Sequence, residues 1–412
     1  MVTFPYCSYK MDTPLDLALQ QLAATLRRLG QHFPADTSEQ QHYLPRQVEG
    51  TALGANVGWT TGFWTGLMWL AYELSGQPQF AQAARAQTAS FAHRLQAGRD
   101  LDHHDLGFLY LLSHVAADQL CALPGARSTA LAAADRLLGR FLPGAGVIQA
   151  WGRLDDPHEH GRTIIDCLMN LPLLHWAARV SGERRYTEVA RIHTLRTREH
   201  LVRTDGATYH TYFFDTLRGT PLRPSTHQGW SDDSCWARGQ AWALYGFALN
   251  HRHLPDLDLL DTACHIADYF LARLPPDRIA LWDLSLPVDS NEPRDSSACA
   301  IAACGLFDLA AQLPAGPRQQ HYRQAAIDLL GALQKLCAAR MPQAGGLLLH
   351  GTYHRQIGLG VDECTLWGDY YYLEALARWQ HGWQSYDSRP LRAHASAAAQ
   401  SPQQTVPAAC AS

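Results

Sequence analysis

Two neighbouring segments of this 412-residue chain carry opposite hydrophobic patterns, and the contrast limits how the chain can fold. The segment from Trp59 to Leu74 is apolar nearly all round and ends at Ser75-Gly76, which predicts a helix buried on every side. The segment from Pro78 to Leu95 keeps its apolar residues on one stripe and Gln, Arg and His on the other face, which predicts a half-exposed helix. Such a pair fits a fold with a buried inner layer and a partly exposed outer layer.

The same alternation continues along the chain. We predict helices at about residues 13–30, 59–74, 78–95, 104–118, 127–140, 163–180, 185–199, 233–253, 257–273, 295–312, 317–340 and 366–380. The Ser-Gly pairs at 75–76 and 181–182 are each followed, at identical offsets, by an aromatic residue and an alanine, which indicates a weak repeat. We therefore predict an all-α fold without a strand ladder, an (α/α)6 barrel of about twelve alternating inner and outer helices. An open α-solenoid is the alternative, but its inner helices would not need to be apolar on all sides.

Composition and charge narrow the domain organisation and the partners. Residues 1–382 are predicted to form one barrel domain, whereas 383–412 end in an Ala, Ser, Gln and Pro tail and are predicted to be disordered. The net charge of −4 offers no basic field to nucleic acid or an anionic membrane, and no apolar run approaches the ~18 residues of a membrane helix. The N-terminus lacks the pattern of a signal peptide, and ten scattered cysteines without a C-x-x-C pair favour the reducing cytoplasm.

Five aspartates stand near the starts of predicted inner helices: Asp105, Asp166, Asp233, Asp295 and Asp369. If the inner helices all point one way, their N-termini meet at one mouth of the barrel, where helix dipoles favour negative charge. Each of the five could be a helix cap, and capping is the preferred interpretation for Asp233, Asp295 and Asp369.

Asp105 and Asp166 differ from the others because apolar sequence surrounds both and they lie one helical hairpin apart. Two nearby carboxylates push their pKa values apart, so that one is ionised and the other protonated, as acid and base chemistry requires. The cap interpretation stays open for Asp166, because the helix begins either near Asn170 or near Asp166 with a kink at Pro172.

Eight short motifs follow one another along the chain. They are Asn56–Glu73, His104–Phe108, Gln149–Trp151, Asp166 with Met169–Leu174, Arg203–His210, Gln228–Trp242, Trp282–Asp283 and Arg294–Ala298. Together, over about residues 15–380, they resemble the unsaturated glucuronyl hydrolases of glycoside hydrolase family 88.

The resemblance implies a fold and a reaction. Members of the family are (α/α)6 barrels that act on oligosaccharides left by polysaccharide lyases, whose non-reducing end is a 4,5-unsaturated uronic acid. They hydrate the double bond: by resemblance, Asp166 protonates C4 and then activates the water that adds at C5, and the resulting hemiketal opens and releases the remaining sugar. The resemblance implies no metal or cofactor, an unsaturated oligosaccharide as the partner, and a monomer or homodimer.

The resemblance also assigns the site. Asp105 matches the family's second aspartate, which stays charged and stabilises developing positive charge. Substrate contacts fall on Trp59, His104, Trp151, His210, Gln228, Arg238 and Trp242. A guanidinium or imidazole suits a uronate carboxylate, and indole rings pack on sugar faces, although core packing is the alternative for each Trp.

Two places depart from the family pattern. The loop from Leu349 to Gly360 does not indicate whether the second sugar is sulfated, and Ala207 stands where many members carry a hydroxyl residue. Three other functions remain as alternatives: an unsaturated rhamnogalacturonyl hydrolase on the same barrel, an acylglucosamine epimerase that uses paired histidines, and a non-catalytic sugar-binding protein.

Overall fold

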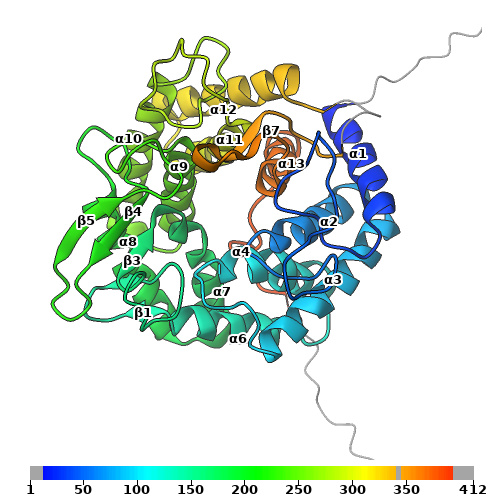
Figure 1. Ribbon diagram of the computed structural model, residues 1–412, viewed down its shortest axis with the longest axis horizontal. Helices are drawn as coiled ribbons and strands as arrows, with labels where there is room; N and C mark the ends of the chain where they lie inside the picture. The colour runs from blue at the N-terminus through cyan, green and yellow to red at the C-terminus, as the bar shows by residue number, and fades with distance from the viewer. Residues whose placement is uncertain (1–12, 340–344, 393–412) are drawn as a thin grey trace, which may run out of the picture.

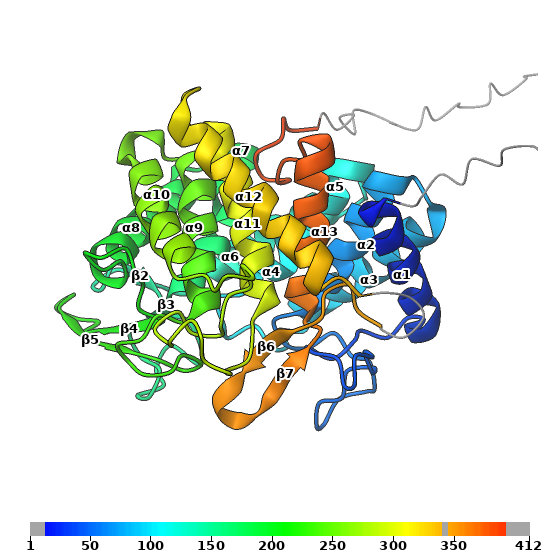
Figure 2. The same cartoon turned by 90° about the horizontal axis from the view of Figure 1, so that it is seen from above.

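The helices form two concentric rings (Figures 1 and 2). The computed structural model describes residues 13–339 and 345–392. The inner ring consists of α2 (Thr61–Ser75), α4 (Leu106–Tyr110) continued by a π-helical turn (Leu111–Val115) and α5 (Ala116–Cys121), α7 (Leu171–Ser181), α9 (Ala237–His251), α11 (Ser296–Gln312) and α13 (Leu366–His381). The outer ring consists of α1 (Pro14–Leu29), α3 (Pro78–Gln96), α6 (Ala126–Leu138), α8 (Arg184–Leu201), α10 (Leu259–Ala272) and α12 (Pro317–Leu336).

Contacts between neighbouring inner helices close the ring. Each inner helix contacts the next one in chain order, and α13 contacts α2. The layers differ in burial as the sequence predicts: α9 is buried at every position from Ala237 to Asn250, whereas α3 buries mainly one stripe that includes Phe80, Ala84 and Phe91. The predicted all-α (α/α)6 barrel is confirmed. None of the described helices combines the length and apolar character that crossing a membrane requires.

Three small antiparallel sheets lie in the connections between helices. They are β1–β2 (Phe141–Leu142, Val147–Ile148), β3–β4–β5 (Arg162–Ile164, Thr211–Phe214, Pro221–Ser225) and β6–β7 (Gly351–His354, Leu359–Glu363). Short 3₁₀ turns, η2 (Ile165–Met169), η3 (Pro255–Leu257) and η4 (Arg355–Ile357), also lie between the helices. The expectation of no strand ladder is wrong for these loops, because strands of two to five residues are too short to show a clear alternation. Figure 2 places β3 to β7 together at one end of the barrel.

The first ten residues of the predicted tail are ordered. Residues 383–392 fold back on the barrel, where the indole of Trp383 and the hydroxyl of Tyr386 both donate hydrogen bonds to Glu73. Tyr386 has no exposed surface, and the guanidinium of Arg389 pairs with Glu73 at 2.7 Å. The prediction of disorder from residue 383 is therefore wrong for this segment, because a few well-placed anchors compensate for a low apolar content. The rest of the tail lies outside the described residues.

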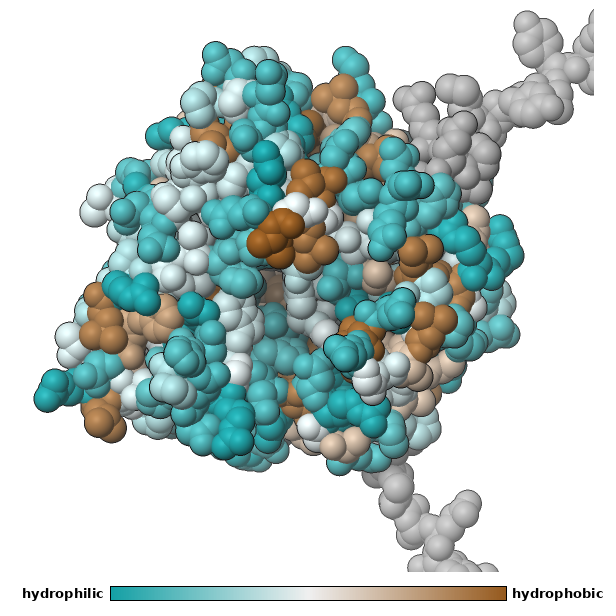
Figure 3. Space-filling model, viewed as in Figure 1, coloured by the Kyte–Doolittle hydropathy of each residue, from teal (hydrophilic) through white to brown (hydrophobic). Residues whose placement is uncertain are grey.

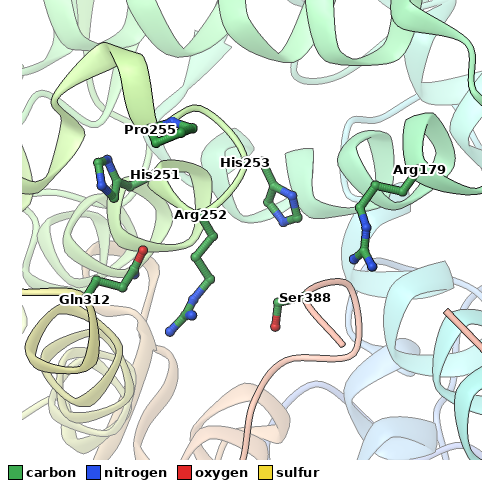
Figure 4. Close-up of a pocket in the computed structure, with 7 residues that line it drawn as sticks. All are labelled: Arg179, His251, Arg252, His253, Pro255, Gln312 and Ser388. Carbon is green, nitrogen blue, oxygen red and sulfur yellow. The ribbon is translucent and has the colours of Figure 1, made fainter. Parts of the chain in front are cut away.

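This segment borders a cavity of about 520 Å³ at the C-terminal ends of α7, α9 and α11 (Figure 4). Arg179 donates hydrogen bonds to the carbonyls of Asp387 and Arg389, and His253 pairs with the Asp387 carboxylate at 2.8 Å. Arg252 pairs with Asp308 at 2.9 Å. The polar groups of this cavity thus hold the C-terminal segment and the helix ends together.

Asp369 gives the fold a pH dependence. It lies in the first turn of α13, fully buried, and accepts hydrogen bonds from the hydroxyl of Tyr43 (3.0 Å) and the backbone N–H of Leu348 (2.9 Å). Burial raises the pKa of Asp369 from 3.8 to about 7. Between these two pH values the folded chain holds a proton that the unfolded chain has released, so the free energy of unfolding falls as pH rises.

We expect the variant Asp369→Asn to remove this dependence, because an amide resembles the protonated acid and can keep both contacts. Across the full range the raised pKa of Asp369 corresponds to roughly 4 kcal/mol, about 3 kcal/mol of it between pH 5 and pH 8. Urea unfolding at pH 5 and pH 8 measures the effect. Asp369→Asn should gain stability over the parent chain at pH 8, and an equal difference at both pH values would show that the buried carboxyl is already ionised at pH 5.

Candidate active site

Close backbone packing brings Asp105 and Asp166 together. Asp105 immediately precedes α4, and Asp166 lies in the turn η2 just ahead of α7. A Cβ atom at Gly107 would lie only 2.3 Å from Cα of Asn170, so glycine permits the two segments to touch. The N–H of Phe108 donates to Oδ1 of Asn170 at 2.9 Å and fixes this contact. The two neighbouring inner helices therefore present their aspartates at one point.

The helix start resolves the alternatives for Pro172. Helix α7 begins at Leu171, with Pro172 in its first turn, where the missing N–H costs no hydrogen bond. Neither Asp105 nor Asp166 makes a side-chain capping bond. By contrast, Asp295 does cap α11, through a hydrogen bond from the N–H of Ser297. The capping interpretation is thus wrong for Asp166 and correct for Asp295.

The two remaining aspartates do not cap helices. Asp233 is exposed in the loop ahead of α9, whose N-cap position is Trp236. Asp369 is buried inside α13, whose capping side chain is Thr365. Capping is therefore wrong for both, and neither residue lines the cavity described below.

Asp105 and Asp166 have opposite pKa shifts. Burial and the negative charge of Asp105 raise the pKa of Asp166 well above its usual value. Burial also acts to raise the pKa of Asp105, but His104, His103 and Arg140 outweigh it and hold that pKa below its usual value. Near neutral pH the pair therefore contains one carboxylate, Asp105, and one carboxylic acid, Asp166.

A cavity of about 280 Å³ opens above this pair. It lies at the end of the barrel where the inner helices begin, and the space-filling view shows this face hollowed near its middle (Figure 3). Seven of the nine residues predicted for the site line the cavity: Trp59, Asp105, Trp151, Asp166, Gln228, Arg238 and Trp242. The sequence thus locates most of the cavity wall.

Arg238 supplies a fixed positive charge to the wall. Its side chain is 1% exposed, pairs with Asp295 at 2.9 Å and donates to the carbonyls of Thr352 (2.6 Å) and Tyr353 (2.8 Å). The guanidinium carbon also lies 4.4 Å from the ring centroid of Trp236. Because these contacts hold the guanidinium in one orientation, the position of its charge is set before any ligand arrives.

The two predicted histidines lie behind the wall. His104 has no exposed surface, and its Nε2 is 3.4 Å from one oxygen of Asp105 and one oxygen of Asp166. His210 packs its ring on Trp236 at 4.2 Å, and its Nδ1 accepts the N–H groups of His227 (3.1 Å) and Gln228 (3.3 Å). His104 therefore contacts the acids, and His210 orients a turn that lines the cavity.

Six further lining residues were not predicted: His227, Trp236, Tyr353, His354, Ile357 and Leu359. Four of them belong to β6, η4 and β7, a hairpin that reaches over the mouth of the barrel. The indole N–H of Trp59 donates to the hydroxyl of Tyr353 at 3.1 Å and ties this hairpin to the start of α2. The sequence marks this region only as a loop, Leu349 to Gly360, that departs from the family pattern.

The buried acid pair can transfer protons and the aromatic rings above it can pack on a sugar, which together suit a carbohydrate-processing enzyme. Comparison with known proteins identifies the family. Residues 35–384 match the model of Glycosyl Hydrolase Family 88. An unsaturated glucuronyl hydrolase of Bacillus sp. (strain GL1) is 45% identical over 371 residues, which are 90% of this chain and 96% of that protein.

Two further comparisons agree. An unsaturated chondroitin disaccharide hydrolase of Streptococcus pyogenes serotype M1 is 42% identical over 374 residues, which are 90% of this chain and 92% of that protein. A crystal structure of unsaturated glucuronyl hydrolase from Bacillus sp. GL1 has 44% identity and a TM-score of 0.86, and covers 91% of this chain and 98% of that one. The chain belongs to glycoside hydrolase family 88.

Proposed function

We propose that the chain hydrolyses oligosaccharides that carry a 4,5-unsaturated uronic acid at the non-reducing end, by hydration of the C4=C5 double bond. The buried pair of Asp105 and Asp166 on the floor of an aromatic cavity is the observation that carries this proposal. The opposite pKa shifts of the two side chains support it, as do the relatives from Bacillus and Streptococcus, which are named for this substrate class.

The proposed reaction uses Asp166 twice. As an acid it donates its proton to C4, which leaves positive charge shared between C5 and the ring oxygen. As a carboxylate it then removes a proton from water while the oxygen of that water bonds to C5, so its own proton is restored. The hemiketal at C5 opens to a ketone, C1 becomes a hemiacetal, and its breakdown releases the remaining sugar.

The neighbouring groups act on charge and orientation. The carboxylate of Asp105 stabilises the positive charge that develops at C5. Arg238 provides the positive potential that attracts the uronate carboxylate, and the indole rings of Trp59 and Trp242 offer flat apolar surfaces to the sugar. Because the reaction does not attack the anomeric carbon, the distance between the two carboxylates does not distinguish retention from inversion.

A panel of lyase-produced disaccharides tests the proposal. We expect turnover of unsaturated chondroitin and hyaluronan disaccharides, seen as loss of the ultraviolet absorbance of the conjugated uronate, because hydration destroys the double bond. The same disaccharides with a saturated uronate are the matched control and should not react. Preference for a rhamnogalacturonan disaccharide would instead assign the chain to the rhamnogalacturonyl hydrolases, and stable absorbance with every sugar would favour the epimerase or binding-protein alternatives.

We also propose that the chain acts in the cytoplasm as a monomer or homodimer. The eight cysteines among the described residues are all free thiols, which suits a reducing compartment. An unsaturated oligosaccharide is the proposed partner, and size-exclusion chromatography with light scattering determines the oligomeric state.

A further inference from the structure

Three side chains at the floor of the cavity have the composition of a metal site. His104, Asp105 and Asp166 each present one nitrogen or oxygen atom, and these atoms lie within 4.8 Å of one another. Nε2 of His104 is 3.4 Å from Oδ1 of Asp105 and 3.4 Å from Oδ1 of Asp166. Imidazole nitrogen and carboxylate oxygen are both common ligands of Zn²⁺.

Two of these ligand atoms lack a hydrogen bond. His104 has no exposed surface, and no hydrogen-bond partner among the described residues meets either of its ring nitrogens. The same holds for Oδ1 of Asp166. A buried polar atom without a partner costs free energy, and an unmet ligand is one of the few explanations for its presence.

We propose that His104, Asp105 and Asp166 form a Zn²⁺-binding site whose occupation inhibits the enzyme. In a tetrahedral site with bonds of about 2.05 Å, neighbouring ligand atoms lie about 3.3 Å apart. The two separations of 3.4 Å from His104 match that geometry. Both aspartates line the cavity, so the fourth coordination position faces the space where a sugar or water binds.

The charges around the three side chains favour the binding of a divalent cation with moderate affinity. Asp105 supplies one carboxylate, and Asp166 supplies a second when the ion displaces its proton to the solvent. The positive charge of Arg238, which pairs with Asp295 at 2.9 Å, opposes the ion in part. A metal-bound histidine normally donates its other ring N–H to an acceptor, and loss of that partner costs about 10- to 100-fold in affinity. Since Nδ1 of His104 has no such acceptor among the described residues, we expect micromolar binding that a chelator reverses.

The inhibition of the enzyme by Zn²⁺ rests on the proposed function, whereas the binding of Zn²⁺ to the three side chains does not. A zinc ion on Asp166 takes the oxygen that would otherwise carry the proton to C4, and it also occupies the place of the attacking water. The ion is therefore a competitor of the reaction and not a cofactor.

Calorimetric titration of ZnCl₂ into the full-length chain, without any sugar, tests the site. The parent is compared with His104→Gln, Asp166→Asn and His350→Gln. His350 pairs with Asp362 at 2.6 Å on the surface, so its variant is a matched control for zinc bound by an exposed histidine and carboxylate. We expect one equivalent bound with micromolar affinity in the parent and in His350→Gln, and about 100-fold weaker binding in His104→Gln and Asp166→Asn.

Thermal unfolding checks that each variant is folded. If His104→Gln does not fold, Asp166→Asn decides, because its side chain reaches the cavity. The absence of binding to the parent below about 1 mM would overturn the proposal, as would equal affinity of the parent and Asp166→Asn. Because the titrations contain no sugar, their outcome does not depend on whether the chain hydrolyses unsaturated oligosaccharides.

Discussion

The variant Asp166→Asn is expected to fold and to bind the unsaturated disaccharide, but to lose turnover by about 10³- to 10⁴-fold. An amide has nearly the size of the protonated acid and occupies the same floor of the cavity. It has no proton to donate to C4 and cannot accept one from water, so both chemical steps lose their catalyst. Ultraviolet absorbance measures turnover, and calorimetry with the inactive variant measures binding.

The matched control for this variant is Asp233→Asn. Asp233 also precedes an inner helix in sequence, but its side chain is exposed and does not line the cavity. We expect parental turnover from Asp233→Asn. Normal turnover from Asp166→Asn would refute the proposed mechanism, and loss of binding together with turnover would mean that Asp166 mainly holds the substrate.

The barrel is predictable because the hydrophobic pattern of each helix indicates whether the helix belongs to the inner or the outer ring. Helix α9 is buried from Ala237 to Asn250, and only an apolar sequence can occupy such a position. Helix α3 shows one buried stripe, which fixes its place in the outer ring. The segment 383–392 has no such pattern: it is held by contacts of Trp383 and Tyr386 with Glu73, a residue more than three hundred positions away.

The residues of the candidate site are predictable only where a charged side chain stands beside apolar sequence that would not be expected to hold it. Asp166 is a carboxylate among apolar residues, Asp105 comes immediately before an apolar run, and the structure brings the two together. Tyr353 and Ile357 conflict with nothing nearby, and they reach the cavity because the hairpin of β6 and β7 packs over the mouth. His104 was predicted to contact the substrate, but its side chain is fully buried behind the cavity wall. A sequence does not reveal on which side of the wall a side chain lies.

The variant Asp105→Asn is expected to lose about 10²- to 10³-fold in kcat, with a smaller change in KM. The Asp105 carboxylate is nearly fully buried beside His104 and lines the cavity, where the proposed mechanism develops positive charge at C5 of the substrate. A neutral amide keeps the shape but not the charge, so the loss falls on the transition state and not on substrate binding.

The melting temperature of Asp105→Asn, compared with its turnover, separates a catalytic role of Asp105 from a structural one. His104, His103 and Arg140 hold the pKa of Asp105 below its usual value, so the ionised carboxylate favours folding. Asp105→Asn should therefore melt somewhat earlier than the parent but stay folded at the assay temperature, while its turnover falls. Asp102→Asn is the matched control, because Asp102 lies three positions earlier on the surface, where it pairs with Arg136 at 2.8 Å, and its loss should leave kcat unchanged. If Asp105→Asn instead kept parental kcat and only melted earlier, the carboxylate would serve the fold, and Asp166 would have to act without a charged neighbour.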